Sequence, residues 1–528
     1  MQQLHDPSPH ARPLSSPPAI ERLSDDLLYA IFELLRSWIC FPGEADVPYR
    51  PLSGHTRIPP PSECEDVPLW TIPIVLSHVC VRWRAFTFAS PRLWSFVRVT
   101  GSFPNRIMMH HFIERSQDCP LSVLLTMPKP KRKGEETIIF VYDLLAVTSE
   151  VGDHAERIQE LGVLLPSRSS NLILEDLAHS PLSNLQKLWL DAGENLSVGD
   201  KPVSLLSVNP SSMRIFHANG ISVDWLAFEG LVRLELSWGS PPTLPELLYT
   251  LRKSPCLEVL KLHIPCSYTD DSVTDQGPPV HLPHLRKLRL TTNAHGDGAF
   301  AVLPHITYSS TTDVELHSRA RLPPDLRENE SLARIAAAVE RADLYLEPRN
   351  RVLVKSDLPS IAITYPAIFR GEHYQWADPG THLDPRLCEA FLAVPFPALT
   401  TLSIFASRLD PFRGASIEQF NLLFAVVSTI THLRLDIDPA YLPVITAALS
   451  KFEDEVDEAR SVRCPNLRCW TVVWSREPSV DDFWLIERCC ARRAAAGVPL
   501  EQLETTAVPE LVLANLQLAV GHISVLHE

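Results

Sequence analysis

Short leucine-rich segments recur along the chain from about residue 119 onward. Their common form is L-x-x-L-x-L, and the clear copies begin at Leu185, Leu231, Leu257, Leu285, Leu399, Ile430 and Leu467. In the middle of the chain the last apolar residues of successive segments stand at positions 236, 262, 290, 316 and 346, which are steps of 26, 28, 26 and 30 residues. A period of this length indicates an array of units, each of which buries its apolar face only by stacking on its neighbours.

Helical patterns come before several of these segments. Leu244, Leu247, Leu248 and Leu251 are spaced as one face of a helix and precede the segment at Leu257. Similar patterns occupy residues 332–339, 420–427, 442–452 and 483–490. In each strand, alternation would send the leucines inward and the residues between them to an open face.

Two architectures fit this alternation of helices and strands. One is a leucine-rich-repeat solenoid, and the other is an α/β protein with a parallel sheet and crossover helices. The regular spacing lies near the upper end of the leucine-rich-repeat range of about 20–29 residues and favours the solenoid. We therefore expect an α/β fold with a small helical domain over residues 19–100 and an irregular leucine-rich-repeat solenoid over residues 101–528.

The first hundred residues lack the leucine-rich segments and have a different sequence pattern. Residues 1–18 are rich in Pro, Ser and His, lack periodicity and are expected to be a disordered tail. An amphipathic helix is predicted from Ser24, which is a suitable N-cap, and a second helical pattern runs from Ile72 to Phe86. The proline-rich stretch 39–69 between them is predicted to be an inserted loop.

Residues 20–38 joined to 70–96 resemble an F-box of the kind found in fungal proteins. The matching pieces read IERLSDDLLYAIFELL, then VLSHVCVRWRAF, then ASPRLWS. The chain departs from the family at Ser24, where Pro is usual, and in the loop 39–69, which separates helices that are usually closer in sequence. Several residues match at fixed relative positions, which makes the resemblance more specific than a short motif.

The resemblance implies the substrate-recognition subunit of an SCF-type cullin–RING ubiquitin ligase. The F-box would dock on the Skp-type adaptor, and through it on cullin, while the repeats would bind an unknown target protein. The apolar side chains expected to fill the adaptor surface, some of which could instead be internal core, are Leu23, Leu27, Leu28, Ile31, Phe32, Leu35, Val79, Trp83 and Leu93. The open-face residues expected to contact the target are Trp189, Glu235, Lys261, Arg289 and Arg434.

Composition and charge narrow the class of partner. The net charge of −15 argues against a nucleic-acid binder, and no apolar window is long enough to predict a membrane span or a signal peptide. The odd number of cysteines, 11, predicts reduced thiols in a cytoplasmic or nuclear protein. Lys129 to Lys133 form a basic cluster that fits a nuclear signal or, more simply, an exposed turn.

Motifs for chemistry are weak, so we expect neither an enzyme nor a metal or cofactor site. Gly296-x-Gly298-x-x-Ala301 with Glu315 fits a dinucleotide-binding pattern, but Pro304 follows at once and favours a loop. Two alternatives to the ligase subunit stay open. One is a leucine-rich-repeat scaffold with a vestigial F-box, and the other is an α/β enzyme whose site would show as a deep pocket.

Overall fold

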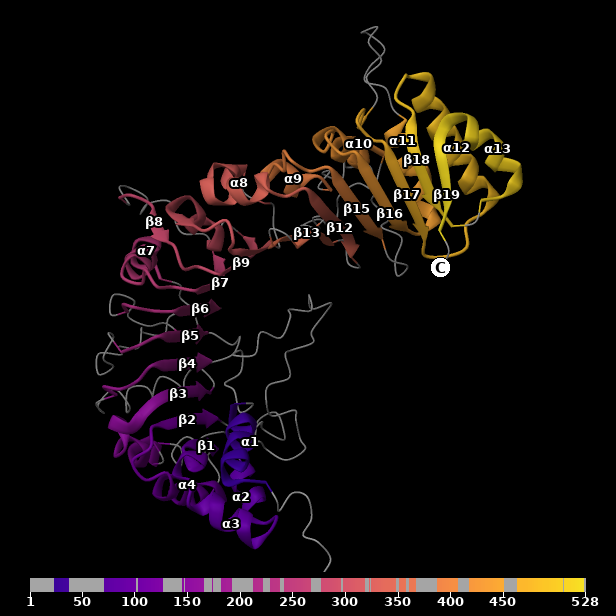
Figure 1. Cartoon of the computed structure of the whole chain (residues 1–528). Helices are drawn as coiled ribbons and strands as arrows, with labels where there is room; N and C mark the ends of the chain where they lie inside the picture. Colours follow the sequence, from indigo (N-terminus) through magenta and orange to yellow (C-terminus); the bar gives the residue numbers. More distant parts are fainter. Residues whose placement is uncertain are drawn as a thin grey trace, which may run out of the picture. The chain divides into compact units, whose positions relative to one another are not determined.

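The computed structural model describes residues 23–37, 71–100, 103–126, 145–146, 148–165, 173, 182–191, 212–221, 228–237, 242–266, 277–295, 298–318, 322, 324–347, 351–357, 360–366, 387–406, 417–450, 463–506 and 508–526. The fold is mixed α/β with a large, mostly parallel sheet and helices (Figure 1). It divides into two compact units, residues 1–162 and 163–528. The tail 1–18 and the stretch 39–69 lie outside the described residues.

The first unit begins with three helices, α1 (Asp25–Ser37), α2 (Ile72–Ser77) and α3 (Val81–Phe88). Ser24 caps α1 as predicted, because its hydroxyl accepts the N–H of Leu27 at 3.3 Å. The second predicted helix is two helices, α2 and α3. Cys80 adopts an extended backbone between them, and its thiol accepts the N–H of Trp83.

The remaining elements of this unit extend beyond the predicted boundary at residue 100. They are η4 (Pro91–Trp94), β1 (Phe96–Thr100), α4 (Phe103–Arg115), β2 (Leu121–Thr126), η5 (Ala155–Arg157) and β3 (Ile158–Leu164), which ends two residues into the second unit. Strands β1 and β2 pair in parallel, with Phe96 opposite Ser122. The ring of Trp94 packs edge-on against Phe112 and donates its indole N–H to the carbonyl of Thr87 at 2.9 Å.

The strands of the second unit form one continuous sheet in the order β4-β5-β6-β7-β9-β11-β14-β13-β12-β15-β16-β17-β18-β19. Their bounds are β4 (Lys187–Asp191), β5 (Ile215–Asn219), β6 (Arg233–Ser237), β7 (Val259–Cys266), β9 (Lys287–His295), β11 (Asp313–Ser318), β12 (Arg341–Glu347), β13 (Arg351–Asp357), β14 (Ser360–Pro366), β15 (Thr401–Ala406), β16 (His432–Ile437), β17 (Cys469–Trp474), β18 (Leu500–Thr505) and β19 (Val520–Val525). A separate parallel pair joins β8 (Val280–Leu282) and β10 (Ile306–Tyr308).

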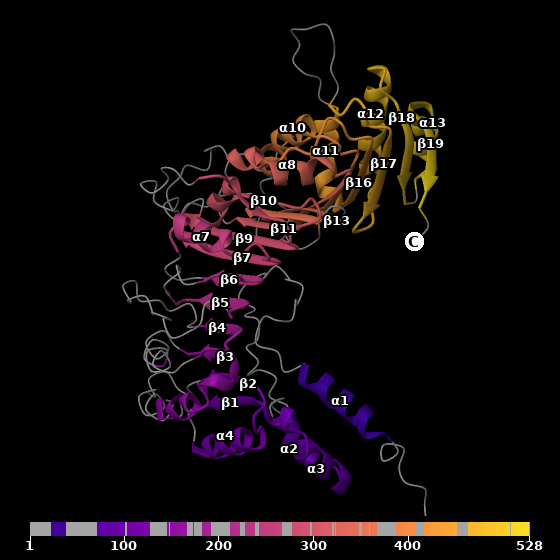
Figure 2. The same cartoon turned by 60° about the vertical axis from the view of Figure 1, so that its left-hand side comes forward.

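Helices connect these strands and gather on one face of the sheet (Figures 1 and 2). They are α7 (Leu244–Arg252), η8 (Gly298–His305), η9 (Pro324–Glu328), α8 (Glu330–Ala337), α9 (Glu389–Ala393), α10 (Ile417–Val426), η11 (Pro439–Tyr441), α11 (Leu442–Leu449), α12 (Val480–Ala495) and α13 (Glu510–Ala519). The predicted helices before the segments at Leu257, Ile430 and Leu467 are therefore present. Thr243 and Ser479 start α7 and α12 with capping boxes.

The L-x-x-L-x-L pattern has a simple structural cause. The first leucine closes a turn: Leu257, Leu285 and Leu467 each donate their N–H to the carbonyl three residues earlier, at 3.1, 3.2 and 3.0 Å. The next residue starts the parallel ladder, as when the N–H of Arg286 donates to the carbonyl of Glu258 at 2.8 Å. The second and third leucines then lie on the strand with their side chains buried toward the helices. A new strand is thus added in the same register where this pattern repeats without interruption, as from β6 to β7 and β9.

The array departs from the sequence expectation between Leu316 and Leu346. The regular steps in the sequence predict that the strand of Leu346 lies beside the strand of Leu316. This prediction is wrong. β14 lies beside β11, with Leu316 opposite Ile363, whereas β12 pairs in parallel with β15. The chain passes from β11 to β12 and then returns through the antiparallel strands β13 and β14 to fill the space between them.

Candidate functional site

Two surfaces carry the residues singled out by the sequence. One is the apolar surface of α1 and α2 in the first unit. The other is the face of the second unit's sheet that the helices leave open, which we call the helix-free face. Among the described residues no group of three or more His, Cys, Asp or Glu side chains could hold a metal ion. No helix in the described part of the chain is long and apolar enough to cross a membrane.

Helix α1 buries one side of its apolar arc and exposes the other. Leu28 and Phe32 are fully buried, and the ring of Phe32 packs edge-on against Trp83 at 5.1 Å between centroids and against Phe86 at 5.7 Å. Arg82 of α3 fixes the start of α1 by donating to the carbonyl of Leu23 at 2.5 Å and to the carboxylate of Asp25 at 2.6 Å. These contacts hold α1 against α3 and set which side of the helix faces outward.

The outward side of α1 presents an exposed apolar stripe made of Leu27, Ile31 and Leu34. Their spacing of four and then three residues places them on one face of the helix. Their exposed fractions are 52%, 37% and 59%. In the same unit Val75 of α2 and Val79, two residues after the end of α2, are also about half exposed. Large apolar side chains at this spacing are unusual on a surface without a partner.

The structure therefore sorts the predicted adaptor-binding residues. Leu27, Ile31 and Val79 are exposed, and Leu23 is half-buried. The buried members, which serve the core, are Leu28, Phe32, Trp83 and Leu93. The side chain of Leu35 lies outside the described residues. Leu34 was absent from the predicted set. Its spacing of seven residues from Leu27 places it on the same face of the helix, and this spacing could have identified it.

The helix-free face carries a row of side chains that runs across consecutive strands. The register places Trp189 opposite His217, His217 opposite Glu235, and Glu235 opposite Lys261. The row continues from Arg289 to Glu315. Farther along the same face, Arg434 of β16 stands opposite Ser403 and Thr471. The predicted target-binding residues thus come from one row of the sheet.

Their exposure differs from the prediction. Trp189 and Glu235 lie on the helix-free face but are buried, so the expectation that they are open to solvent is wrong. His217 stacks on the ring of Trp189 at 3.7 Å between centroids, which covers it. Lys261 and Arg289 keep only about a fifth of the side chain exposed, at 19% and 21%, and Arg434 is exposed.

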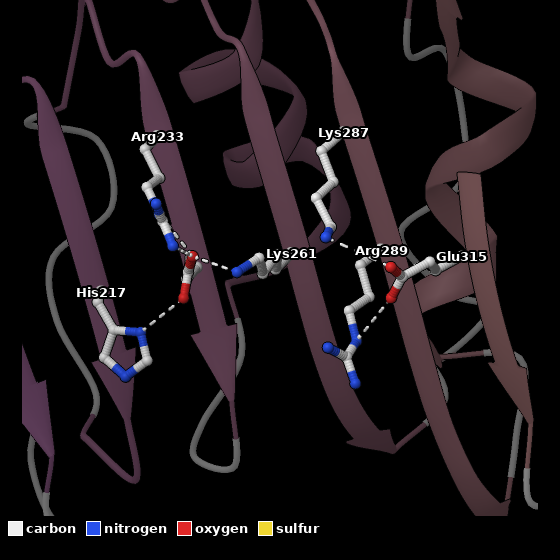
Figure 3. A network of polar contacts seen from close by, with 7 residues as sticks. His217, Arg233, Lys261, Lys287, Arg289 and Glu315 are labelled. Carbon is white, nitrogen blue, oxygen red and sulfur yellow. Dashed lines mark hydrogen bonds and ion pairs between the residues drawn. The ribbon is translucent and has the colours of Figure 1, made fainter. Parts of the chain in front are cut away.

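Glu235 is the centre of the first of two ionic clusters on this face (Figure 3). Its carboxylate lies 2.6 Å from the Arg233 guanidinium, 2.9 Å from the Lys261 ammonium and 3.2 Å from Nδ1 of His217. Burial alone would raise the pKa of Glu235. The hydrogen bond with His217 and the charges of His217, Lys261 and Arg233 outweigh burial and lower the pKa to about 2.

Glu315 is the centre of the second cluster, which has longer contacts (Figure 3). Lys287, Arg289 and His317 lie 3.3, 3.5 and 3.6 Å from its carboxylate oxygens. Burial again opposes ionisation. His317, Arg289 and Lys287 prevail and lower the pKa of Glu315 to about 2. The residues of the dinucleotide-like pattern have structural roles. Glu315 is held by Lys287, Arg289 and His317. Residues 298–305 form the 3-10 helix η8, in which Phe300 and Leu303 are buried.

The lowered pKa values of Glu235 and Glu315 predict how the stability of the fold depends on pH. Both have a folded pKa below the ordinary value of 4.5, so their contribution is complete above pH 4.5 and is lost as the pH falls toward 2. For Glu235, the loss amounts to about 3 kcal/mol. We expect acid titration followed by circular dichroism to show unfolding in this window. Glu235→Gln should lessen the slope of stability against pH between 4.5 and 2, and an unchanged slope would contradict this account.

Compared with known proteins, the chain matches no family model and no curated protein.

Proposed function

We propose that the chain is the substrate-recognition subunit of an SCF-type cullin–RING ubiquitin ligase. The exposed apolar stripe of α1 is the observation that carries this proposal. It offers three large apolar side chains on a helix whose other side is fixed by Phe32, Trp83 and Arg82, so little conformational entropy is lost on docking. A helix of this kind suits a hydrophobic groove on a partner protein.

The large sheet, in this proposal, is an irregular leucine-rich-repeat array. The repeated turn, buried leucine and parallel strand support this assignment, since β6, β7 and β9 follow one another in parallel with their leucines opposite each other. The target would bind the helix-free face. Arg434 is exposed there and Lys261 and Arg289 are partly exposed, whereas Trp189 and Glu235 would act by holding their neighbours in place.

Adaptor binding can be tested without disturbing the core. We expect the full chain to co-elute with its host's Skp-type adaptor on size exclusion, and Leu27→Asp with Ile31→Asp to abolish co-elution. Burying a leucine or isoleucine contributes about 1.5–3 kcal/mol, so the pair should weaken the affinity by at least about 100-fold. A substitution at Trp83 would report on folding instead, because its ring is buried against Phe32.

Tyr29→Asp is the matched control. Tyr29 is 37% exposed, as is Ile31, but it lies on the opposite side of α1. It should leave binding unchanged. Failure of the folded wild-type chain to bind the adaptor would refute the proposal. If deletion of residues 40–68 then restored binding, the insertion would be the obstacle; if it did not, a scaffold with a vestigial F-box would be the better description.

A further inference from the structure

The last described helix and strand of the second unit, α13 and β19, expose large apolar side chains. Helix α13 packs on α12 and covers β19 with Val512, Leu516 and Ala519, which are buried. Leu511 and Leu518, however, are 72% and 88% exposed. They are seven residues apart and so lie on the same side of α13. We call Leu511, Leu518 and the half-exposed Val525 of β19 the end face.

Helix α11 shows what such apolar positions do inside the array. It packs between α10 and α12, and its apolar side chains Leu442, Ile445, Ala448 and Leu449 are buried. Helix α13 has α12 on one flank and two exposed leucines in its sequence. An end unit that faces water usually has a polar outer surface. In α13 and β19 the polar Asn515, Gln517 and His522 are exposed, but so are the apolar Leu511, Leu518 and Val525.

Strand β19 adds a hydrogen-bonding edge to this surface. In the described part of the chain its register pairs it with β18, and Figures 1 and 2 show it as the last strand of this sheet. The N–H of Leu526 donates to the carbonyl of Thr505 at 2.9 Å, toward β18. Because N–H groups alternate along a strand, those of Ile523 and Val525 point to the outer edge.

This edge has none of the usual protection against pairing. Residues 520–525 read VGHISV and contain no Lys, Asp, Glu, Arg or Pro, the residues that commonly block strand edges. Between residues 508 and 526 the single charged side chain is Glu510. A surface with so little charge gives no strong preference for an acidic or a basic partner, and it lets two identical surfaces approach with little repulsion.

We infer that the end face is the interface of a homodimer, in which β19 pairs with β19 of a second copy of this chain. A two-fold axis brings the same strand of both copies together in antiparallel orientation, which continues the sheet across the interface. Leu511 and Leu518 of each copy then bury their side chains against the other. This inference does not depend on the proposed function, and its test uses no adaptor.

Sedimentation velocity of the full chain over a range of concentrations tests the inference. We expect a dimer for the wild type, and a dissociation constant at least about 100-fold higher for Leu511→Lys with Leu518→Lys, since four apolar side chains leave the interface. Leu392→Lys on α9 is the matched control, because Leu392 is also an exposed leucine on a helix. It should leave the dimer intact.

A charge-complementation experiment separates loss of the interface from loss of folding. Leu511→Glu with Leu518→Glu should also be monomeric, and mixing this variant with the lysine variant should restore a dimer, because opposite charges then meet. A wild-type chain that stays monomeric up to about 50 μM would overturn the inference. So would a dimer that survives the lysine variant, or a mixture of folded variants that does not associate.

Discussion

Arg493→Met is expected to lower the free energy of unfolding of the second unit by about 3 kcal/mol. Arg493 lies in the last turn of α12 and is 1% exposed. Its guanidinium donates to the carbonyls of Arg463 and Cys464 at 2.9 Å and to that of Leu467 at 3.4 Å. Methionine would fill the space but remove these donors. The carbonyl of Cys464 would keep the N–H of Leu467, whereas the carbonyls of Arg463 and Leu467 would lose the guanidinium, and a buried acceptor that loses its donor costs about 1–3 kcal/mol.

The turn that Arg493 holds is itself strained. Cys464 has a φ of 48°, in the left-handed region that residues with a side chain rarely adopt. The turn leads directly to the Leu467 segment and β17, so its loss would loosen the strand that carries the fully buried Trp470. Lysine should not rescue the position, because one ammonium lacks the fork that reaches several carbonyls at once.

Native-state hydrogen exchange is the suitable measurement, because the chain has two compact units and a single global transition is not assured. Amides of β17 and α12 should exchange faster in the variant, while those of β4 to β7 should change less. Arg492→Met is the control, since Arg492 is the exposed neighbour on the same helix and should cost less than about 1 kcal/mol. Equal effects of the two variants would contradict the role given to Arg493.

Glu235→Ala is expected to cost about 4 kcal/mol. The side chain of Glu235 is 8% exposed, and its removal takes away the carboxylate that lies 2.6 Å from the guanidinium of Arg233 and 2.9 Å from the ammonium of Lys261. Both cations are largely buried, so water cannot fully compensate for the lost carboxylate. Thermal unfolding and hydrogen exchange of β5 to β7 would measure the loss.

Glu501→Ala provides the comparison for an exposed pair. Glu501 and Arg468 lie 3.1 Å apart with side chains 63% exposed, and a pair of this kind contributes at most about 1 kcal/mol. In the double variant Glu235→Ala with Lys261→Met, the cost should be less than the sum of the single costs, because one uncompensated cation is gone. Additive costs would show that Glu235 and Lys261 are not coupled.

The repeated strands and most helices could be predicted from the sequence, because their signals are local. Leu234, Leu260 and Leu288 mark strands by their spacing, and Thr243 marks the start of α7. The sequence of the final segment predicts no single element, for an equally local reason. Residues 510–519 are helical and 520–525 are a strand, so their apolar residues follow two periods in succession.

The rest depends on which segments become neighbours, and no local pattern contains that information. The stacking of His217 on Trp189, for example, joins residues of two different strands. Likewise, Phe32 and Ile31 are adjacent apolar residues of one helix, and only the position of Trp83 on α3 decides which of them is core. From the sequence alone, Arg493 would be predicted to be an ordinary surface arginine. Only the fold brings it to the turn at Cys464, whose carbonyl it binds.

The reversed order of β12, β13 and β14 has a consequence for how this chain folds. Strands β12 and β13 are separated by residues 348–350 and β13 and β14 by residues 358–359, so both hairpins need only short loops to close. The parallel ladders on either side, β11 with β14 and β12 with β15, join segments far more distant along the chain and form more slowly. We therefore expect the three-stranded meander to form first and the parallel strands on either side of it to be added later.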